Sequence, residues 1–454
     1  MNVNVSKKGV LFLILIILVL FLALSGVPRI DKAMCADKDT YKNLKLFNQV
    51  LDMIENDYVE EVDSKTVIEG AIKGMIKTLD PHSVYLTPEM YKDLSVSTKG
   101  VFGGLGIEIT LVDDIITVVA PLEDTPAYRA GLKAGDQIVG IDGESTKGFT
   151  IYDAVHKLRG TVGTTVTISI MREGFDQPKE YEITRDKIKI QSVKNRVFED
   201  GIGYIRLTNF QETTTQELED ALDEISIKDE PLKGMVLDMR NNPGGLLTQA
   251  VRVSDIFLSS GVIVSSKGRQ DDSEKIFKAQ DDGDEVTCPM VVLINGGTAS
   301  ASEIVAGALQ DNGRALILGT QSFGKGSVQI VTPLSDGSAL KLTVAKYYTP
   351  SGTSIQAKGI APDIVVESVD HRLTAKEKIK RLREKDLKNH IEGEGETIEE
   401  PEGTPDEGGS TDETDEISED IIGVDLEKDL QLKTAVDILK SWQILKKQGT
   451  DRAS

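Results

Sequence analysis

Cysteine, histidine and tryptophan are scarce in this chain of 454 residues, which contains two, four and one of them. Cys35 and Cys288 are the only cysteines, and neither belongs to a cluster, so we expect no structural disulfide. The histidines do not cluster either, and we expect no metal site. Basic residues are also in deficit, with 52 Lys and Arg against 74 Asp and Glu. The resulting net charge of −22 argues against nucleic acid as a partner.

The N-terminus combines positive charge with a long apolar run. Lys7 and Lys8 precede residues 10–24, which are nearly all Leu, Ile, Val and Phe. This pattern predicts a secretory signal or an uncleaved signal anchor over residues 1–28. Residues 10–24 are borderline in length for crossing the cell membrane, extension to Val27 makes a span possible, and the lysines favour an extracytoplasmic position for the rest of the chain. Anchoring and secretion after cleavage both stay open.

The length predicts about three domains, and 39% hydrophobic residues suffice for globular cores. Apolar residues recur at helical spacing in a first region, with a break at Asp57–Val62. The sequence Asp80-Pro81-His82-Ser83 then favours a turn that ends the helix over a functional role for His82. We divide the chain after the signal into a helical region at 40–95, further units at 100–186 and 187–370, an acidic linker at 391–420 and a helix at 425–447.

The acidic segment 391–420 holds fourteen Asp or Glu and no Lys or Arg. Such a composition is typical of a solvated, disordered linker, and an acidic recognition tail is the alternative. The segment after it returns to helical spacing.

Short β-branched runs, glycine turns and two short helical patterns alternate between residues 100 and 186. This order resembles a PDZ domain, in which a glycine-rich loop binds a peptide's terminal carboxylate and the peptide adds to a sheet edge. The matching loop residues here are Gly104, Leu105, Gly106 and Ile107. Phosphate binding is the alternative for such a loop, but a lysine is missing. Arg159 ends the second helical pattern. It either contacts the catalytic unit and signals that a peptide is bound, or it is an ordinary surface arginine.

Strand and helix patterns alternate between residues 187 and 370, which predicts an α/β fold. Strands are expected at 202–207 and 234–239 and a helix at 213–225. The second strand runs into the turn Arg240-Asn241-Asn242-Pro243-Gly244-Gly245. A long strand is expected at 338–349.

The stretch 291–329 carries the candidate chemistry. A strand-like run ends at Ile294, a turn of small residues follows, and Ser300 precedes a helical pattern at 301–310. Serine needs a base, and no histidine lies nearby, but a buried lysine with a lowered pKa can serve. Lys325 lies between two glycines, and Gln329 follows on the same face of an extended chain. A helix N-cap at the serine and a plain Gly-Lys-Gly turn remain the alternatives.

The sequences GGTASASEIVAGALQD and GTQSFGKGSVQ resemble the signature of the carboxy-terminal processing peptidases, tail-specific serine proteases with a Ser–Lys dyad. The resemblance implies that Ser300 is the nucleophile, Lys325 the base and Gln329 the residue that positions the base. Ser302 is the competing nucleophile, placed second.

The same resemblance implies an oxyanion hole built from the backbone amides of Ala301 and of Gly245, which is favoured over Gly244. It also implies four parts in chain order: N-terminal helices, a PDZ β-sandwich or barrel with helices, a crotonase-like ββα protease core, and a C-terminal helix. The expected fold class is therefore a multidomain α/β protein. A homodimer formed with the help of the N-terminal helices is expected, and no cofactor.

These observations predict an extracytoplasmic serine endopeptidase whose PDZ domain recognises apolar C-termini of substrate proteins. Two other classes stay open. A non-catalytic PDZ scaffold is disfavoured by the intact candidate dyad. An acyl-thioester enzyme, which shares the crotonase fold, is disfavoured by the export signal and the peptide-binding module.

Overall fold

The computed structural model describes residues 38–453 except 199, 227–230, 271–272, 284, 369–381, 394–425 and 427. The predicted signal or anchor segment, Cys35 and most of the predicted acidic linker therefore lie outside the described residues. None of the described helices is long and apolar enough to cross a membrane. The chain divides into two compact units, one ending at Ile72 and one beginning at Lys73.

The described part of the first unit is helical. Helix α2 spans Lys38–Asp57, and helix α3, which spans Ser64–Lys77, begins in this unit. The interruption between them agrees with the predicted break. Helix α2 carries a row of apolar side chains at helical spacing that are exposed in the single chain: Tyr41, Leu44, Phe47 and Val50.

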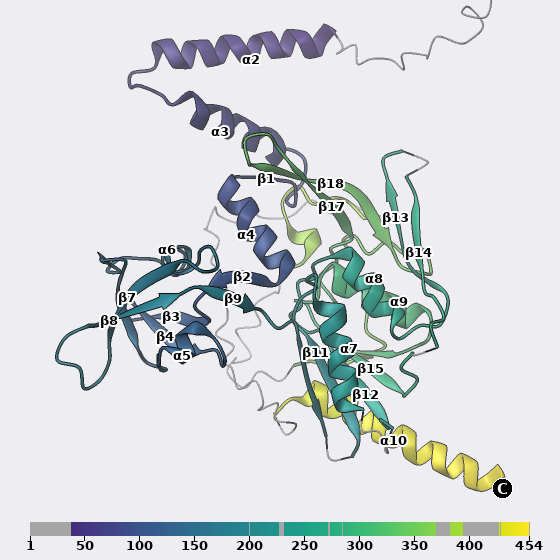
Figure 1. Ribbon diagram of the computed structural model, residues 1–454. Coiled ribbons are helices and arrows are strands. Elements are labelled where there is room, and N and C mark those ends of the chain that lie inside the picture. Colours follow the sequence, from purple (N-terminus) through teal and green to yellow (C-terminus); the bar gives the residue numbers. More distant parts are fainter. Residues whose placement is uncertain are drawn as a thin grey trace, which may run out of the picture. The chain divides into compact units, whose positions relative to one another are not determined.

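The part of the second unit near residues 100–186 is built around one antiparallel sheet. Its strand order is β3-β4-β5-β7-β8, with β6 paired to β5, and the first and last strands of the region, β2 and β9, pair separately (Figure 1). The bounds are α4 Pro88–Lys99, β2 Val101–Gly104, β3 Ile107–Val112, β4 Ile115–Pro121, α5 Pro126–Arg129, β5 Gln137–Ile141, β6 Glu144–Ser145, α6 Ile151–Leu158, β7 Thr165–Met171, β8 Lys179–Thr184 and β9 Asp186–Lys189. One apolar core lies under this sheet and its helices.

A second, mostly parallel sheet has the order β10-β11-β12-β15-β16-β19, in which only β10 runs antiparallel to its neighbour. Its bounds and those of its helices are β10 Val193–Val197, β11 Ile202–Leu207, α7 Thr214–Ile225, β12 Gly234–Asp238, α8 Leu247–Asp255, β15 Met290–Ile294, α9 Ala301–Asp311, β16 Leu316–Gly319, β19 Ile364–Val365 and α10 Leu430–Ala453. The strands and helices predicted at 202–207, 213–225, 234–239 and 301–310 are confirmed within one residue.

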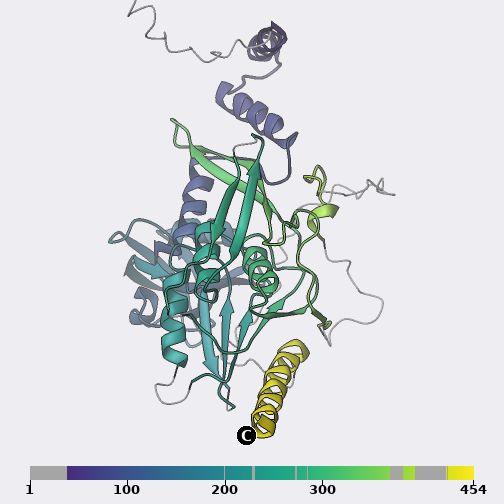
Figure 2. The same cartoon turned by 90° about the vertical axis from the view of Figure 1, so that its right-hand side faces the viewer.

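Alternation along the strands gives this sheet two buried faces. In β12, Met235 and Leu237 belong to the core that includes α7, α8 and α9, whereas Val236 belongs to the core under α10. Helix α10 contributes Leu432 and Leu439 to that second core. Figure 1 shows α7, α8 and α9 along one face, and Figure 2 shows α10 at the other. Because parallel strands end at a common edge, the loops after β12 and β15 meet there.

The remaining strands form a smaller antiparallel sheet of order β1-β18-β13-β14, with β17 also paired to β18 (Figure 1). Its bounds are β1 Val84–Leu86, β13 Val262–Gly268, β14 Lys275–Lys278, β17 Ser327–Pro333 and β18 Ala339–Tyr348, and a short 3-10 helix η1 follows at Glu384–Asp386. The long strand predicted at 338–349 corresponds to β18. Strand β1 was not predicted, because three residues after a turn carry too little periodicity to be recognised.

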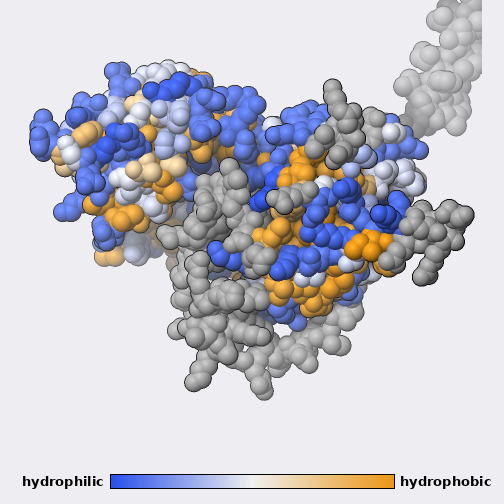
Figure 3. All heavy atoms as spheres, turned by 90° about the horizontal axis from the view of Figure 1, so that it is seen from below, coloured by the Kyte–Doolittle hydropathy of each residue, from blue (hydrophilic) through white to orange (hydrophobic). Residues whose placement is uncertain are grey.

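Hydrophilic side chains cover most of the described surface seen in Figure 3, and apolar ones form smaller areas between them. Half-buried Cys288 has a free thiol.

Candidate active site

Ser300 lies in the tight turn between strand β15 and helix α9. Its backbone has φ 55° and ψ −112°, which is strained for a residue other than glycine. The turn leaves Ser300 partly exposed at the positive N-terminal end of α9. Ser302, the competing nucleophile, is 0% exposed, and its hydroxyl donates to the carbonyl oxygen of Asn242 at 3.0 Å. The two serines therefore differ in both strain and access.

A buried carboxylate joins the backbone of Ser300 to that of Lys325. One oxygen of Glu303 accepts the N–H of Ser300 at 2.7 Å and the N–H of Lys325 at 2.9 Å. Its other oxygen accepts the Ser322 hydroxyl at 2.6 Å and the Gly324 N–H at 2.7 Å. Glu303 is 0% exposed, and burial raises its pKa to about 7 although these four hydrogen bonds lower it.

Lys325 is half-buried at the end of this loop. Burial lowers the pKa of its ammonium group, and the nearby positive charge of Lys341 lowers it further. Three carboxylates act in the opposite sense and raise this pKa: Glu384, Glu303 and Asp80. The balance lies below the usual value near 10.5, in the direction that a lysine base requires.

Gln329 lies on β17 opposite Thr343 of β18. Its amide nitrogen donates to the hydroxyl oxygens of Ser327 at 2.9 Å and Thr343 at 3.3 Å. Among the described residues, no hydrogen bond joins the Ser300 hydroxyl, the Lys325 amine and the Gln329 amide to one another. The structure therefore brings the backbones of Ser300 and Lys325 together through Glu303. In a chain without substrate, catalytic side chains are often not yet aligned.

The glycine turn after β12 lies directly against Ser300. A Cβ atom added to Gly244 would come within 3.0 Å of the Ser300 Cβ and 2.9 Å of the Ala301 nitrogen. The N–H of Gly244 already donates to the Asn242 side chain at 2.9 Å. Within the described part of the chain, the N–H groups of Gly245 and Ala301 donate no hydrogen bond. Both stay available to an oxyanion, and this difference favours Gly245 over Gly244.

The glycine turn after β12 is held by side chains that the sequence did not indicate. The Arg240 guanidinium binds Asp238 at 2.6 Å and Asp429 at 2.7 Å, and it also contacts Gln431. Asp238 is fully buried, and its pKa is lowered because the charge and hydrogen bonds of Arg240 outweigh desolvation. Asp429 and Gln431 lie at the start of α10, so the C-terminal helix is tied to the loop that carries Gly244.

The predicted carboxylate-binding loop connects β2 to β3. Leu105 is buried, and Gly106 has φ 73° and lies so close to the Thr125 side chain that an added Cβ would clash with it. The N–H groups of Leu105 and Gly106 donate to no other described residue, whereas Gly104 and Ile107 belong to the flanking strands. This loop has the free donors that a carboxylate needs.

Arg159 caps the end of α6. Its guanidinium lies 4.3 Å from the centre of the Phe102 ring, and burial lowers its pKa while the charge of Asp93 raises it. No described hydrogen bond or ion pair connects Arg159 to Ser300 or Lys325.

Polar groups from distant segments surround the lysine loop. His82 of the Asp-Pro-His-Ser turn lies 2.7 Å from Glu384, whose side chain also accepts from Gln356 at 2.8 Å. Gln356 in turn accepts the N–H of Gly326 at 3.0 Å. No sequence pattern indicates this chain of contacts. A pattern does exist for Glu303, since Ser300-Ala-Ser-Glu303 has the spacing of a capping box.

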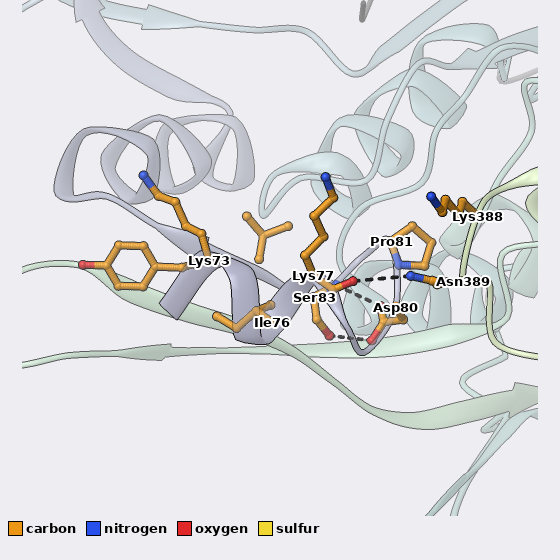
Figure 4. Close-up of a pocket in the computed structure, with 10 residues that line it drawn as sticks. Lys73, Ile76, Lys77, Asp80, Pro81, Ser83, Lys388 and Asn389 are labelled. Carbon is orange, nitrogen blue, oxygen red and sulfur yellow. Dashed lines mark hydrogen bonds between the residues drawn. The ribbon is translucent and has the colours of Figure 1, made fainter. Parts of the chain in front are cut away.

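A cavity of about 460 Å³ lies beside the turn at residues 80–83 (Figure 4). Its walls include Asp80, Ser83 and the basic side chains of Lys73, Lys77 and Lys388, and none of the candidate catalytic residues lines it. In the described residues, no group of His, Cys, Asp and Glu has the arrangement of a metal site.

Family models match three parts of the chain. The model "Peptidase family S41" matches residues 201–366, "PDZ domain" matches 103–183, and "Activating protease CtpB N-terminal domain" matches 25–90. Together with the observed sheets, these matches confirm the predicted fold class.

Curated relatives cover most of the chain. A carboxy-terminal-processing protease of Bartonella bacilliformis is 51% identical over 369 residues, which are 80% of this chain and 83% of the relative. The carboxy-terminal processing protease CtpA of Bacillus subtilis is 39% identical over 71% of this chain and 69% of its own length. Among solved structures, a photosystem II D1 C-terminal processing protease is 32% identical over 71% of this chain and 92% of its own, with a TM-score of 0.42.

Proposed function

Because this chain belongs to the carboxy-terminal processing proteases of peptidase family S41, and is thus a serine-type peptidase with a PDZ domain, we propose that Ser300 and Lys325 form its catalytic dyad. The protein would bind a substrate protein by its C-terminus and cleave it as an endopeptidase. No step of this mechanism requires a cofactor.

In this mechanism, neutral Lys325 accepts the proton of the Ser300 hydroxyl as the serine oxygen attacks a backbone carbonyl. The N–H groups of Gly245 and Ala301 stabilise the oxyanion of the tetrahedral intermediate. Protonated Lys325 then gives its proton to the leaving amine, and an acyl-enzyme remains. Water attacks the ester, Lys325 accepts a proton from that water, and Ser300 is regenerated. Gln329 orients Lys325 throughout.

The shared Glu303 carboxylate is the observation that carries this assignment. It binds the backbone N–H groups of Ser300 and Lys325 with the same oxygen, so nucleophile and base belong to one rigid frame. The strained backbone of Ser300 and the lowered pKa of Lys325 support the same pair, and the buried hydroxyl of Ser302 argues against that serine.

Substrate capture is assigned to the loop Gly104, Leu105, Gly106 and Ile107. Its two unengaged N–H groups suit a terminal carboxylate, and β3 offers an edge to which an extended peptide can add as a strand. Ile107 and Ile109 of β3 are apolar and only partly buried, which favours an apolar C-terminal side chain. Arg159 would report peptide occupancy to the catalytic unit from its position against Phe102.

We also assign the protein to the extracytoplasmic side of the cell membrane, either anchored by residues 10–27 or released after cleavage of a signal peptide. Lys7 and Lys8 before the apolar run support this orientation. A homodimer is proposed as well, because the row of exposed apolar side chains on α2 is suited to contact a second copy.

The test compares wild type with Ser300→Ala, Ser302→Ala and Lys325→Ala on an unstructured protein with an apolar C-terminus, with products identified by mass spectrometry. We expect Ser300→Ala and Lys325→Ala to lower the rate at least ~10³-fold. Ser302→Ala, the matched control on the same helix, should keep substantial activity. Loss of activity in Ser302→Ala with survival of Ser300→Ala would reverse the assignment. Binding of the tail by a wild type that never cleaves would favour the scaffold function instead.

A further inference from the structure

We propose that Thr343, whose hydroxyl is committed to Asp80, is a positioning residue that fixes the orientation of the Gln329 amide. This inference rests on the proposed function, in which Gln329 supports the catalytic lysine. It gives the Asp-Pro-His-Ser turn, whose sequence favours a simple end to the helix, a part in arranging the active site.

The turn is itself rigid. Asp80 is 6% exposed and Ser83 is 5% exposed. One Asp80 oxygen accepts the N–H groups of His82 and Ser83, both at 2.8 Å, and the other accepts the Ser83 hydroxyl at 2.6 Å. Figure 4 shows Asp80 and Ser83 joined in this way beside the cavity. Because the carboxylate is held from its own turn, it can serve as a fixed acceptor for a neighbouring strand.

That neighbour is β18. Strand β1 pairs with it so that Val84 lies opposite Lys341, which brings the preceding turn to Thr343. The Thr343 N–H donates to the Ser83 hydroxyl oxygen at 3.0 Å, and the Thr343 hydroxyl donates to Asp80 at 3.1 Å. An ionised carboxylate only accepts hydrogen bonds, so the single hydroxyl proton of Thr343 points to Asp80. Hydrogen bonds and burial act on Asp80 in opposite senses, and the net effect lowers its pKa, which keeps it ionised.

The direction of this hydrogen bond decides which way the Gln329 amide faces. Because the Thr343 hydroxyl donates its hydrogen bond to Asp80, the Thr343 oxygen can only accept a hydrogen bond from Gln329. The amide nitrogen therefore faces Thr343, at 3.3 Å, and its second hydrogen is taken by Ser327 at 2.9 Å. The amide oxygen is then left over as an acceptor, and within the described residues it receives no hydrogen bond. In the proposed function, the neutral Lys325 amine has two N–H groups and one lone pair. An acceptor for one N–H group would orient the amine so that its lone pair can face the Ser300 hydroxyl.

The experiment measures kcat and KM of Thr343→Val, Thr343→Ser and Thr332→Val on an unstructured peptide substrate. Valine keeps the shape of threonine without its hydroxyl, serine restores the hydroxyl, and Thr332 is an exposed threonine of the adjacent strand β17 that serves as the matched control. We expect Thr343→Val to lower kcat ~10-fold or more with KM changed less than about twofold, since misorientation affects the chemical step more than binding. Thr343→Ser and Thr332→Val should stay close to wild type.

A double-mutant cycle with Gln329→Ala separates this role from a general structural one. If Thr343 acts through Gln329, Thr343→Val should cause no further loss in the Gln329→Ala background. An equal loss in both backgrounds would overturn the inference while leaving Gln329 and the dyad intact. A Gln329→Ala variant with the kcat of wild type would instead refute the role of Gln329 in the proposed function. Thermal unfolding of each variant, expected within a few degrees of wild type, shows that the comparison is between folded proteins.

Discussion

Glu303→Gln is the substitution that most directly tests how the proposed dyad of Ser300 and Lys325 is held. All four partners of Glu303 are donors in the structure: three backbone N–H groups and the Ser322 hydroxyl. Glutamine keeps one accepting oxygen and replaces the other with an NH2 group. The Ser322 hydroxyl can turn and accept from that NH2 group, but a backbone N–H cannot. At least one N–H, that of Gly324 in the best arrangement, is then left without an acceptor.

The size of the expected loss of activity depends on the number of buried N–H groups left without an acceptor. A buried donor that loses its partner costs about 1–3 kcal/mol. If the lost hydrogen bond displaces Ser300 and Lys325 so that the whole cost is added to the activation free energy, kcat/KM falls roughly 5- to 160-fold. The uncharged amide avoids the desolvation penalty of the carboxylate, so the fall in the free energy of unfolding should stay at or below the same figure.

The effect should also depend on pH. Burial raises the pKa of Glu303 from its usual value near 4.5 to about 7, so between these values the folded protein binds more protons at this site than the unfolded one. The contribution of Glu303 to the free energy of unfolding therefore decreases as pH rises through that window. The protonated acid resembles glutamine, so the ratio of wild-type to variant kcat/KM should be smaller at pH 6 than at pH 8.

A continuous assay with an internally quenched peptide, run from pH 6 to 9, measures these ratios, and urea unfolding reports the change in stability. Glu219→Gln is the control, because Glu219 is exposed on α7. A folded Glu303→Gln protein with kcat/KM within twofold of wild type at pH 8 would show that Glu303 does not hold Ser300 and Lys325 in their active positions.

Three further outcomes are expected. Because burial lowers the pKa of Lys325, kcat/KM should rise with pH along an acid limb whose midpoint lies below 10.5, and a flat profile from about pH 5 to 9 would contradict a lysine base. Asp429→Asn should lower the free energy of unfolding in urea by about 1–2 kcal/mol, because it weakens the ion pair between α10 and Arg240, whereas Asp437→Asn on the exposed side of α10 should change it little. Amidation of the substrate's C-terminus should raise KM several-fold with kcat nearly unchanged, since the N–H groups of Leu105 and Gly106 lose a charged acceptor; equal KM values for acid and amide would argue against capture by this loop.

The sequence predicted the main strands and helices of the parallel sheet but not the short strand β1, and it indicated Ser300 and Lys325 as catalytic candidates. Strands β11, β12 and β15 are continuous apolar runs because both faces of a parallel sheet are buried, and that pattern is visible in one dimension. Ser300 and Lys325 each lie beside glycine-rich turns, where chain direction changes and side chains become accessible. Local spacing and resemblance therefore indicate these residues without information on the contacts between them.

Contacts between distant segments depended on the tertiary structure. Asp80 and Thr343 are 263 positions apart, and only the pairing of β1 with β18 brings them within 3.1 Å. Arg240 contacts Asp429, 189 positions away, because α10 packs against one face of the sheet. A carboxylate in a sequence does not reveal which donors will surround it, since a hydrogen bond depends on position and angle within fractions of an ångström. The sequence thus indicates which side chains are candidates for chemistry, and the fold sets which neighbours contact them, how their hydrogen bonds are directed and how their pKa values shift.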